Sequence, residues 1–316
     1  MIAFIFPGQG SQQVGMGKAL AEAFPVCRDV FVKADKVLGE SLSRVCFEGP
    51  EDLLGLTENT QPAVLTTSVA AFRLLESRGL LPDFLAGHSL GEYSAHVAAG
   101  TFSFEEAVTI VKLRGRYMQE AVPVGSGAMA AVLGLDASRV VQACEEVSGS
   151  GVVSAANFNA PNQIVIAGSR DAVSRAGARA RELGAKRVVP LPVSAPFHTE
   201  LMQPAQAKLS SKLYALRTTK PKLPVVADVD ADLKLDAPSS ISALIDQTSN
   251  PILWEKVVRR LASEGVCTYV EVGPGTVLSA LVRKIDKEAK VMNVQDPDGL
   301  SAVESWWKES GHPVSK

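Results

Sequence analysis

The sequence predicts an α/β protein with a mostly parallel sheet and a second, smaller domain inserted in it. The chain opens with an apolar run, Ile2–Phe6, that ends at Pro7-Gly8, which is typical of a strand buried on both faces of a parallel sheet. Strand-like and helix-like segments then alternate along much of the chain, as expected when helices cover a parallel sheet. Residues 125–197 depart from this pattern and follow the order βαββαβ.

Composition limits the classes of function. The chain has 316 residues and 46% hydrophobic content, enough for a large core, and 32 Lys and Arg balance 34 Asp and Glu. This balance gives no electrostatic reason to expect binding to nucleic acid or to an anionic membrane. The apolar start is too short for a signal peptide, and no stretch approaches the ~18 apolar residues of a membrane span. We therefore expect a cytoplasmic protein.

The four cysteines do not form a recognisable metal or disulfide motif. They are widely spaced and include no Cys-x-x-Cys pair. This pattern predicts reduced thiols, with neither a disulfide framework nor a metal site.

The first part of the predicted large domain contains one further strand and several helices. The strand covers residues 84–87. Ser103 is a candidate N-cap, with Glu105 and Glu106 in the first turn of its helix. The expected helices cover residues 18–24, 25–38, 62–78, 90–100 and 103–119.

The predicted insert has the ferredoxin-like order βαββαβ. Its two helices are expected to begin near Asp136 and Asp171, which we interpret as helix caps. The expected elements are strands at 128–133, 152–157, 163–167 and 186–191, and helices at 136–147 and 169–183. We assign residues 125–197 to this small domain, and residues 1–124 and 198–316 to the large catalytic domain.

The chain after the insert returns to alternating strands and helices. Strands are expected at 225–227 and 268–272, and helices at 199–216, 239–247, 252–264 and 276–285. In a parallel sheet of this kind the active site lies at the carboxyl ends of the strands.

A Gly-x-Ser-x-Gly sequence follows the strand at 84–87. Gly87-His88-Ser89-Leu90-Gly91 stands between that apolar run and a helix, the layout of a nucleophile elbow that exposes a serine hydroxyl at a sharp corner. The glycines let the backbone turn without colliding with its neighbours. The alternative is an ordinary loop serine.

The glycine-rich loop after the first strand fits no nucleotide-binding motif. Gln13 stands where a dinucleotide fingerprint needs its third glycine, and the Gly-Lys-Ser/Thr of a P-loop is absent. The remaining interpretation is that the glycines let the backbone and the amide of Gln9 approach a reaction centre.

A serine nucleophile needs a base, and the chain has four histidines. His88 is expected to point away from Ser89, His96 lies about 10 Å along the next helix, and His312 is in the polar tail. His198 remains as the candidate base, although it could simply cap the following helix. No acid is obviously placed to orient it, so a carbonyl or an amide could be the third member.

Two further groups are candidates for the chemistry. The main-chain N-H of Leu90 follows the nucleophile and suits an oxyanion hole, with a second donor from the Gln9 loop. Arg114 would by default be a solvated helix arginine. Alternatively, its guanidinium could clamp a substrate carboxylate through two hydrogen bonds, which would select strongly for charged substrates.

Four motifs in order carry a resemblance to a known family: Pro7-Gly8-Gln9-Gly10-Ser11-Gln12, Gly87-His88-Ser89-Leu90-Gly91-Glu92, Arg114 and Pro196-Phe197-His198. With these, nearly the whole chain resembles the malonyl-CoA:acyl carrier protein transacylases of bacterial fatty acid synthesis. The resemblance implies an α/β-hydrolase-like large domain with the inserted ferredoxin-like domain.

The resemblance also implies roles for individual residues. Ser89 would be the acylated nucleophile, His198 its base, Gln9 and Leu90 the oxyanion hole, and Arg114 the malonyl carboxylate clamp. Gln247 would orient His198 through its main-chain carbonyl, and Met118 would line the pocket. Phe197 matches the malonyl-selecting form of the motif rather than the Tyr-x-Ser-His form associated with methylmalonyl.

The implied activity is a ping-pong transfer of malonyl from malonyl-CoA to the phosphopantetheine thiol of acyl carrier protein. It would need no metal and no bound cofactor, and the enzyme would be a monomer. Arg187 and Arg283 are candidate docking residues for the acidic carrier protein. The alternatives are a transacylase that serves a polyketide synthase in trans, a serine thioesterase or esterase, and a carrier-protein binding module without activity.

Overall fold

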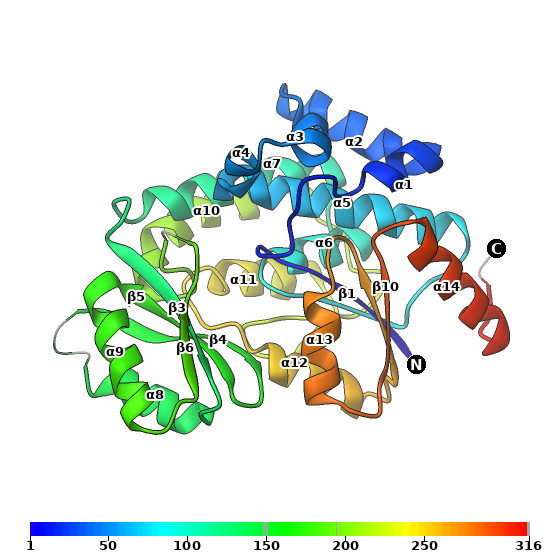
Figure 1. The fold of residues 1–316 in the computed structure, drawn as a ribbon. Coiled ribbons are helices and arrows are strands. Elements are labelled where there is room, and N and C mark those ends of the chain that lie inside the picture. Colours follow the sequence, from blue (N-terminus) through cyan, green and yellow to red (C-terminus); the bar gives the residue numbers. More distant parts are fainter. Residues whose placement is uncertain (148, 150, 194, 315–316) are drawn as a thin grey trace.

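The computed structural model describes residues 1–147, 149, 151–193 and 195–314. It places two sheets side by side, a mostly parallel one with helices on both faces and a smaller antiparallel one (Figure 1). Within the described residues, no helix is both long and apolar enough to cross a membrane.

The larger sheet has the strand order β10-β9-β1-β2-β7-β8, parallel except for the β7-β8 pair. Phe6 of β1 lies opposite Gly87 of β2, so the two chain segments that follow these strands emerge together at one sheet edge. The chain enters β1 in the middle of the sheet and then builds outward on both sides, which makes the carboxyl ends of β1 and β2 a topological switch point. The strands are β1 (Ile2–Phe6), β2 (Phe84–Gly87), β7 (Val225–Val226), β8 (Leu233–Lys234), β9 (Thr268–Val272) and β10 (Lys290–Val294).

Strand β1 is buried on both faces, as its apolar run predicts. Ile2, Phe4 and Phe6 belong to the core beneath one helical layer. Ala3 and Ile5 belong to the core on the opposite face. The helices of the large domain are α1 (Lys18–Ala23), α2 (Pro25–Leu38), α3 (Leu42–Glu48), α4 (Glu51–Gly55), α5 (Thr57–Ser77), α6 (Leu90–Ala98), α7 (Phe104–Glu120), α10 (Gln203–Tyr214), α11 (Ala237–Asp246), α12 (Trp254–Ser263), α13 (Val277–Ile285) and α14 (Pro297–Glu309), with a 3-10 turn η2 (Glu200–Met202).

The smaller sheet confirms the βαββαβ order. Its strands pair antiparallel as β4-β5-β3-β6, the arrangement of a ferredoxin-like fold. Residues 148, 150 and 194 of the predicted insert lie outside the described residues. The elements are β3 (Gly127–Leu133), α8 (Ala137–Glu145), β4 (Val153–Ala160), β5 (Gln163–Ser169), α9 (Arg170–Glu182) and β6 (Arg187–Pro190).

Strand β4 pairs with the segment that precedes α12. The Ile252 N-H donates to Ala156 O at 2.9 Å, and the Phe158 N-H donates to Ile252 O at 2.8 Å. Ile252 was expected to begin a helix, but α12 begins at Trp254, because Ile252 is held in this bridge to Asn157. On one face of the smaller sheet, Met129 belongs to a cluster with Met118 of α7. The other face packs on α8 and α9.

Two predicted helices have different bounds. Helix α5 begins at Thr57 and not at Pro62, because the side chains of Asn59 and Thr60 donate to the carbonyls of residues 53 and 54 and fix an additional turn. The single helix expected at 199–216 is a 3-10 turn followed by α10, since Pro204 lacks the N-H needed to continue the preceding turn and instead begins a new helix.

Some elements were not predicted, and one cap was wrong. Helices α3, α4 and α14 and strands β8 and β10 were missed. Asp136 caps α8 with its side chain, but Asp171 lies in the first turn of α9, whose N-cap is Ser169. The Ser103 cap is confirmed and forms a complete capping box with Glu106.

Candidate active site

Ser89 lies at a strained corner between β2 and α6. Its backbone has φ 52° and ψ −102°, a region that costs a non-glycine residue free energy and is common at functional sites. A Cβ on Gly87 would lie 2.0 Å from Gly91 C, and one on Gly91 would lie 2.0 Å from Phe6 O. Gly87 is therefore required where the strand turns into α6, and Gly91 where α6 packs against β1, as the motif predicts.

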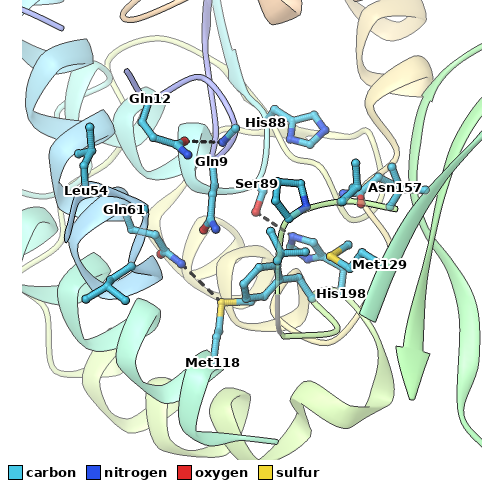
Figure 2. Close-up of a pocket in the computed structure, with 18 of the residues that line it drawn as sticks. Gln9, Gln12, Leu54, Gln61, His88, Ser89, Met118, Met129, Asn157 and His198 are labelled. Atoms are coloured by element: carbon cyan, nitrogen blue, oxygen red, sulfur yellow. Dashed lines mark hydrogen bonds between the residues drawn. The ribbon is translucent and has the colours of Figure 1, made fainter. Parts of the chain in front are cut away.

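The Ser89 hydroxyl has two polar partners from distant parts of the chain. Its Oγ lies 2.8 Å from His198 Nε2, and Arg114 Nη2 donates to it at 3.1 Å. Figure 2 shows the Ser89 and His198 side chains facing each other at the cavity. The structure thus brings together a serine, a histidine and an arginine that are far apart in sequence.

The protonation of His198 follows from its second partner. Its Nδ1 lies 2.8 Å from the main-chain oxygen of Gln247. A carbonyl oxygen can only accept a hydrogen bond, so the ring proton is on Nδ1 and Nε2 is free to accept from Ser89. Burial, and next the charge of Arg114, lowers the pKa of His198 to about 3, so the ring is neutral at pH 7.

Arg114 is buried, with 2% of its surface exposed, so the default expectation of a solvated arginine is wrong. Nη1 donates to Gln61 Oε1 at 2.9 Å, and Nη2 donates to Gln247 Oε1, also at 2.9 Å. Its guanidinium also lies 5.4 Å from the centre of the Tyr93 ring. The face of α7 that carries Arg114 packs against α5. Gln61 of α5 accepts the hydrogen bond that water would accept from an exposed arginine.

The two candidate oxyanion donors remain free. Leu90 is the first residue of α6, where a main-chain N-H has no acceptor within the helix. Among the described residues, neither the Leu90 N-H nor the Gln9 N-H has a hydrogen-bond acceptor. The Gln9 side chain donates to Thr57 Oγ1 at 3.3 Å and lines the cavity.

The cavity above Ser89 has a volume of about 650 Å³ and is lined by the segments that follow β1 and β2, by helices of the larger part of the chain and by the smaller sheet. Met118 and Phe197 form part of its wall, as predicted, and Met129 and Asn157 contribute from the smaller sheet. Figure 2 labels Met118, Met129 and Asn157 among the side chains around the cavity. Arg187 and Arg283 do not line it; both are exposed. His88 points to Asn159 Oδ1, 2.8 Å from its Nε2.

Sequence reasoning missed Gln61, Glu92 and Asp228. Glu92 and Asp228 lie beneath the elbow with no exposed surface, and burial raises the pKa of both carboxyl groups. Asp228 follows β7 at the carboxyl edge of the parallel sheet. That position could have indicated from the sequence that Asp228 lies near the site. Among the described residues, no three His, Cys, Asp or Glu side chains are grouped to hold a metal ion.

Comparison with known proteins places these features in a family. A family model described as "Acyl transferase domain" matches residues 3–304. The chain is 47% identical over 309 residues to the malonyl CoA-acyl carrier protein transacylase of Bacillus subtilis, covering 98% of each chain.

Solved structures of similar sequence have the same fold and carry similar names. An acyl carrier protein S-malonyltransferase from Vibrio cholerae is 45% identical, with a TM-score of 0.94, covering 96% of this chain and 99% of that one. A malonyl-transacylase solved in complex with a type II PKS acyl-carrier protein is 44% identical, with the same TM-score and coverage. The chain therefore belongs to the acyl transferase family, together with the proteins named malonyl CoA-acyl carrier protein transacylase.

Proposed function

We propose that this enzyme transfers a malonyl group from malonyl-CoA to the phosphopantetheine thiol of acyl carrier protein, through an ester on Ser89. The observation that carries the proposal is the shared hydroxyl: Ser89 Oγ contacts both a neutral histidine base and a buried guanidinium. The first suits acyl transfer, and the second suits an acyl group that ends in a carboxylate.

In the first half-reaction, Ser89 Oγ attacks the thioester carbonyl carbon while His198 Nε2 takes the hydroxyl proton. The negative charge that develops on the carbonyl oxygen is stabilised by the N-H groups of Leu90 and Gln9. When the carbon-sulfur bond breaks, the proton on His198 passes to the sulfur of CoA. The products are free CoA and malonyl-Ser89.

The second half-reaction reverses these steps with a different thiol. His198 takes the proton of the pantetheine thiol, and the thiolate attacks the ester carbonyl carbon. The carbon-oxygen bond then breaks, and His198 returns the proton to Ser89 Oγ. Gln247 holds the histidine ring in the required tautomer throughout, through its main-chain oxygen. Each proton moves between groups of the chain and its substrates, and the CoA thioester is a substrate rather than a bound cofactor.

Arg114 selects the acyl group. Its position beside Ser89 Oγ lets the malonyl carboxylate replace the hydroxyl as acceptor of the Nη2 donor. An acetyl group would leave this buried charge without a new partner, and a neutral substrate is rejected on that ground. Met118 and Phe197 bound the space left for the acyl group.

The two proposed domains have different roles at the site. We assign residues 1–124 and 198–316 to the catalytic domain, and 125–197 to the small domain that completes the cavity wall through Met129 and Asn157. A pantetheine arm of either CoA or carrier protein would pass between them to reach Ser89. Arg187 and Arg283, both exposed, are proposed to contact the acidic carrier protein.

The test is transfer to holo carrier protein, followed by intact-mass spectrometry. The wild-type enzyme should convert the carrier protein to its malonyl form and release one CoA for each malonyl group transferred. Ser89→Ala should lower the rate by at least ~10³-fold. Release of free malonate faster than transfer would instead indicate a thioesterase.

A second candidate function is malonyl supply to a polyketide synthase in trans. It is favoured by the 44% identity to a malonyl-transacylase solved with a type II PKS acyl-carrier protein. Transfer rates to fatty acid and polyketide carrier proteins, measured side by side, distinguish the two pathways. The chemistry on Ser89 is the same in both.

A further inference from the structure

Two buried carboxyl groups hold the nucleophile corner from behind. Asp228 Oδ2 accepts the Ser89 N-H at 2.7 Å. Glu92 Oε2 accepts the Asp228 N-H at 3.0 Å, which ties the loop after β7 to the first turn of α6. Neither carboxyl group lines the cavity, so neither would contact the substrate. Their contacts act on the strained backbone of Ser89.

The same two groups fix the side-chain amide of Gln247. Its Nε2 donates to Glu92 Oε2 at 2.7 Å, to Ser89 O at 3.0 Å and to Asp228 Oδ2 at 3.3 Å. Its Oε1 accepts from Arg114 Nη2 at 2.9 Å. A flipped amide would turn its NH₂ toward the guanidinium and its oxygen toward the carboxyl groups. The acids therefore hold the amide in the one orientation in which Gln247 Oε1 accepts from Arg114.

The charges around the pair imply that it carries a single proton. Two carboxyl groups that share one donor in a buried site cannot readily both be ionised, and burial, with their mutual repulsion, raises the pKa of Asp228. The nearby titratable groups are Tyr93, His96, Asp230 and Arg114. Burial raises the pKa of Tyr93 to about 12 and lowers that of His96 to about 3, so both are neutral. Arg114 is then the buried cation that one negative charge balances.

We propose that Glu92 and Asp228 form a positioning pair that shares one proton, and that it holds Ser89 directly and Arg114 through Gln247. The pair couples two properties that are otherwise separate, the rate of acylation and the preference for a carboxylated acyl group. The malonyl and acetyl assays that test this inference rest on the proposed function, whereas the contacts that support it do not.

The experiment compares Glu92→Gln, Asp228→Asn and the double variant, with Asp230→Asn as the matched control. Asp230 is two residues from Asp228 but is exposed and is paired with Lys234. Each variant is assayed for malonyl and acetyl transfer and for thermal unfolding. Reaction of Ser89 with a serine-directed fluorophosphonate gives a readout that needs no acyl-CoA.

Each single variant keeps the shape of the pair and one negative charge, so it should retain malonyl transfer within ~10-fold of wild type. The double variant removes the charge, and its rate should fall at least ~10-fold below the product of the two single effects. Its malonyl-to-acetyl ratio should fall at least ~5-fold, because the Gln247 amide is no longer held as an acceptor for Arg114 Nη2. The control should match the wild type in both assays.

A double variant that folds and equals the product of the single effects, with an unchanged acyl ratio, would overturn the proposal. If the double variant does not fold, the single variants test the proposal. A folded single variant whose rate of malonyl transfer falls more than ~10-fold contradicts a shared proton. Rates within ~10-fold of wild type in both single variants support it. Absence of malonyl transfer in the wild type would instead refute the proposed function, while fluorophosphonate rates would still rank the variants.

Discussion

Arg114 Nη2 donates to Ser89 Oγ at 3.1 Å, so the group that would recognise the acyl carboxylate contacts the atom that would attack its carbonyl. Acyl recognition and acyl transfer therefore meet at one oxygen atom. The consequences for activity, pH dependence and stability can each be measured.

Arg114→Ala should lower kcat/KM for malonyl transfer by at least ~10-fold, the effect of losing a hydrogen bond to a charged group. Acetyl transfer should be unchanged or faster, since acetyl has no carboxylate to bind. Arg116→Ala is the control, because Arg116 lies on the same helix but is partly exposed and paired with Glu58. Equal losses for malonyl and acetyl would assign Arg114 a structural role.

The rate of Ser89 acylation should change little between pH 8 and about pH 5. A base works in its neutral form, and a pKa of His198 lowered to about 3 keeps that form dominant throughout this range. A histidine with its ordinary pKa of about 6.5 would lose roughly 30-fold at pH 5. Single-turnover acylation with malonyl-CoA, at pH values where circular dichroism shows the native fold, makes the measurement.

Arg114→Gln should move the acid limb of that pH profile to higher pH. The positive charge of Arg114 is the second cause that lowers the pKa of His198. Removing it raises the pKa, so His198 becomes protonated, and inactive as a base, at a higher pH than in the wild type. An acid limb that stays in place would mean that burial alone sets the pKa.

Gly91→Ala should lower the free energy of unfolding by about 3 kcal/mol, as expected when a methyl group is forced into a packed backbone contact. The added Cβ would lie 2.0 Å from Phe6 O, so β1 or α6 must shift. Gly55→Ala is the control, because no atom beyond its chain neighbours and its own helix backbone lies within 4 Å of its Cβ position. Gly55→Ala should change stability by less than about 1 kcal/mol. Chemical denaturation of the two variants tests the difference.

The parts of the fold that sequence predicted well are those with strong local signals. Strand β1 and the glycine corner at Ser89 depend on apolar runs and close backbone contacts that only certain residues allow. The missed strand β10 lies at the edge of the sheet and is only partly buried, so its apolar pattern is weak. Helix α14 had a signal in Asp296 and Pro297, an N-cap followed by proline at the first turn.

The polar layer behind the site was harder to predict, because its pairs join distant parts of the chain. Gln61 and Arg114 meet only when α5 packs on α7, and Arg114 read alone is an ordinary helix arginine. Glu92 and Asp228 are 136 residues apart and meet only when β7 lies beside β2. No local pattern contains that information.

A ping-pong transfer requires that a malonyl ester forms on Ser89 before any acceptor thiol is present. Rapid mixing with malonyl-CoA alone, followed by acid quench and peptide mapping, measures it directly. We expect a burst of CoA that approaches one equivalent per enzyme, with malonyl on the peptide that contains Ser89, and no burst from Ser89→Ala. CoA release without a burst, or malonyl on any other residue, would contradict it.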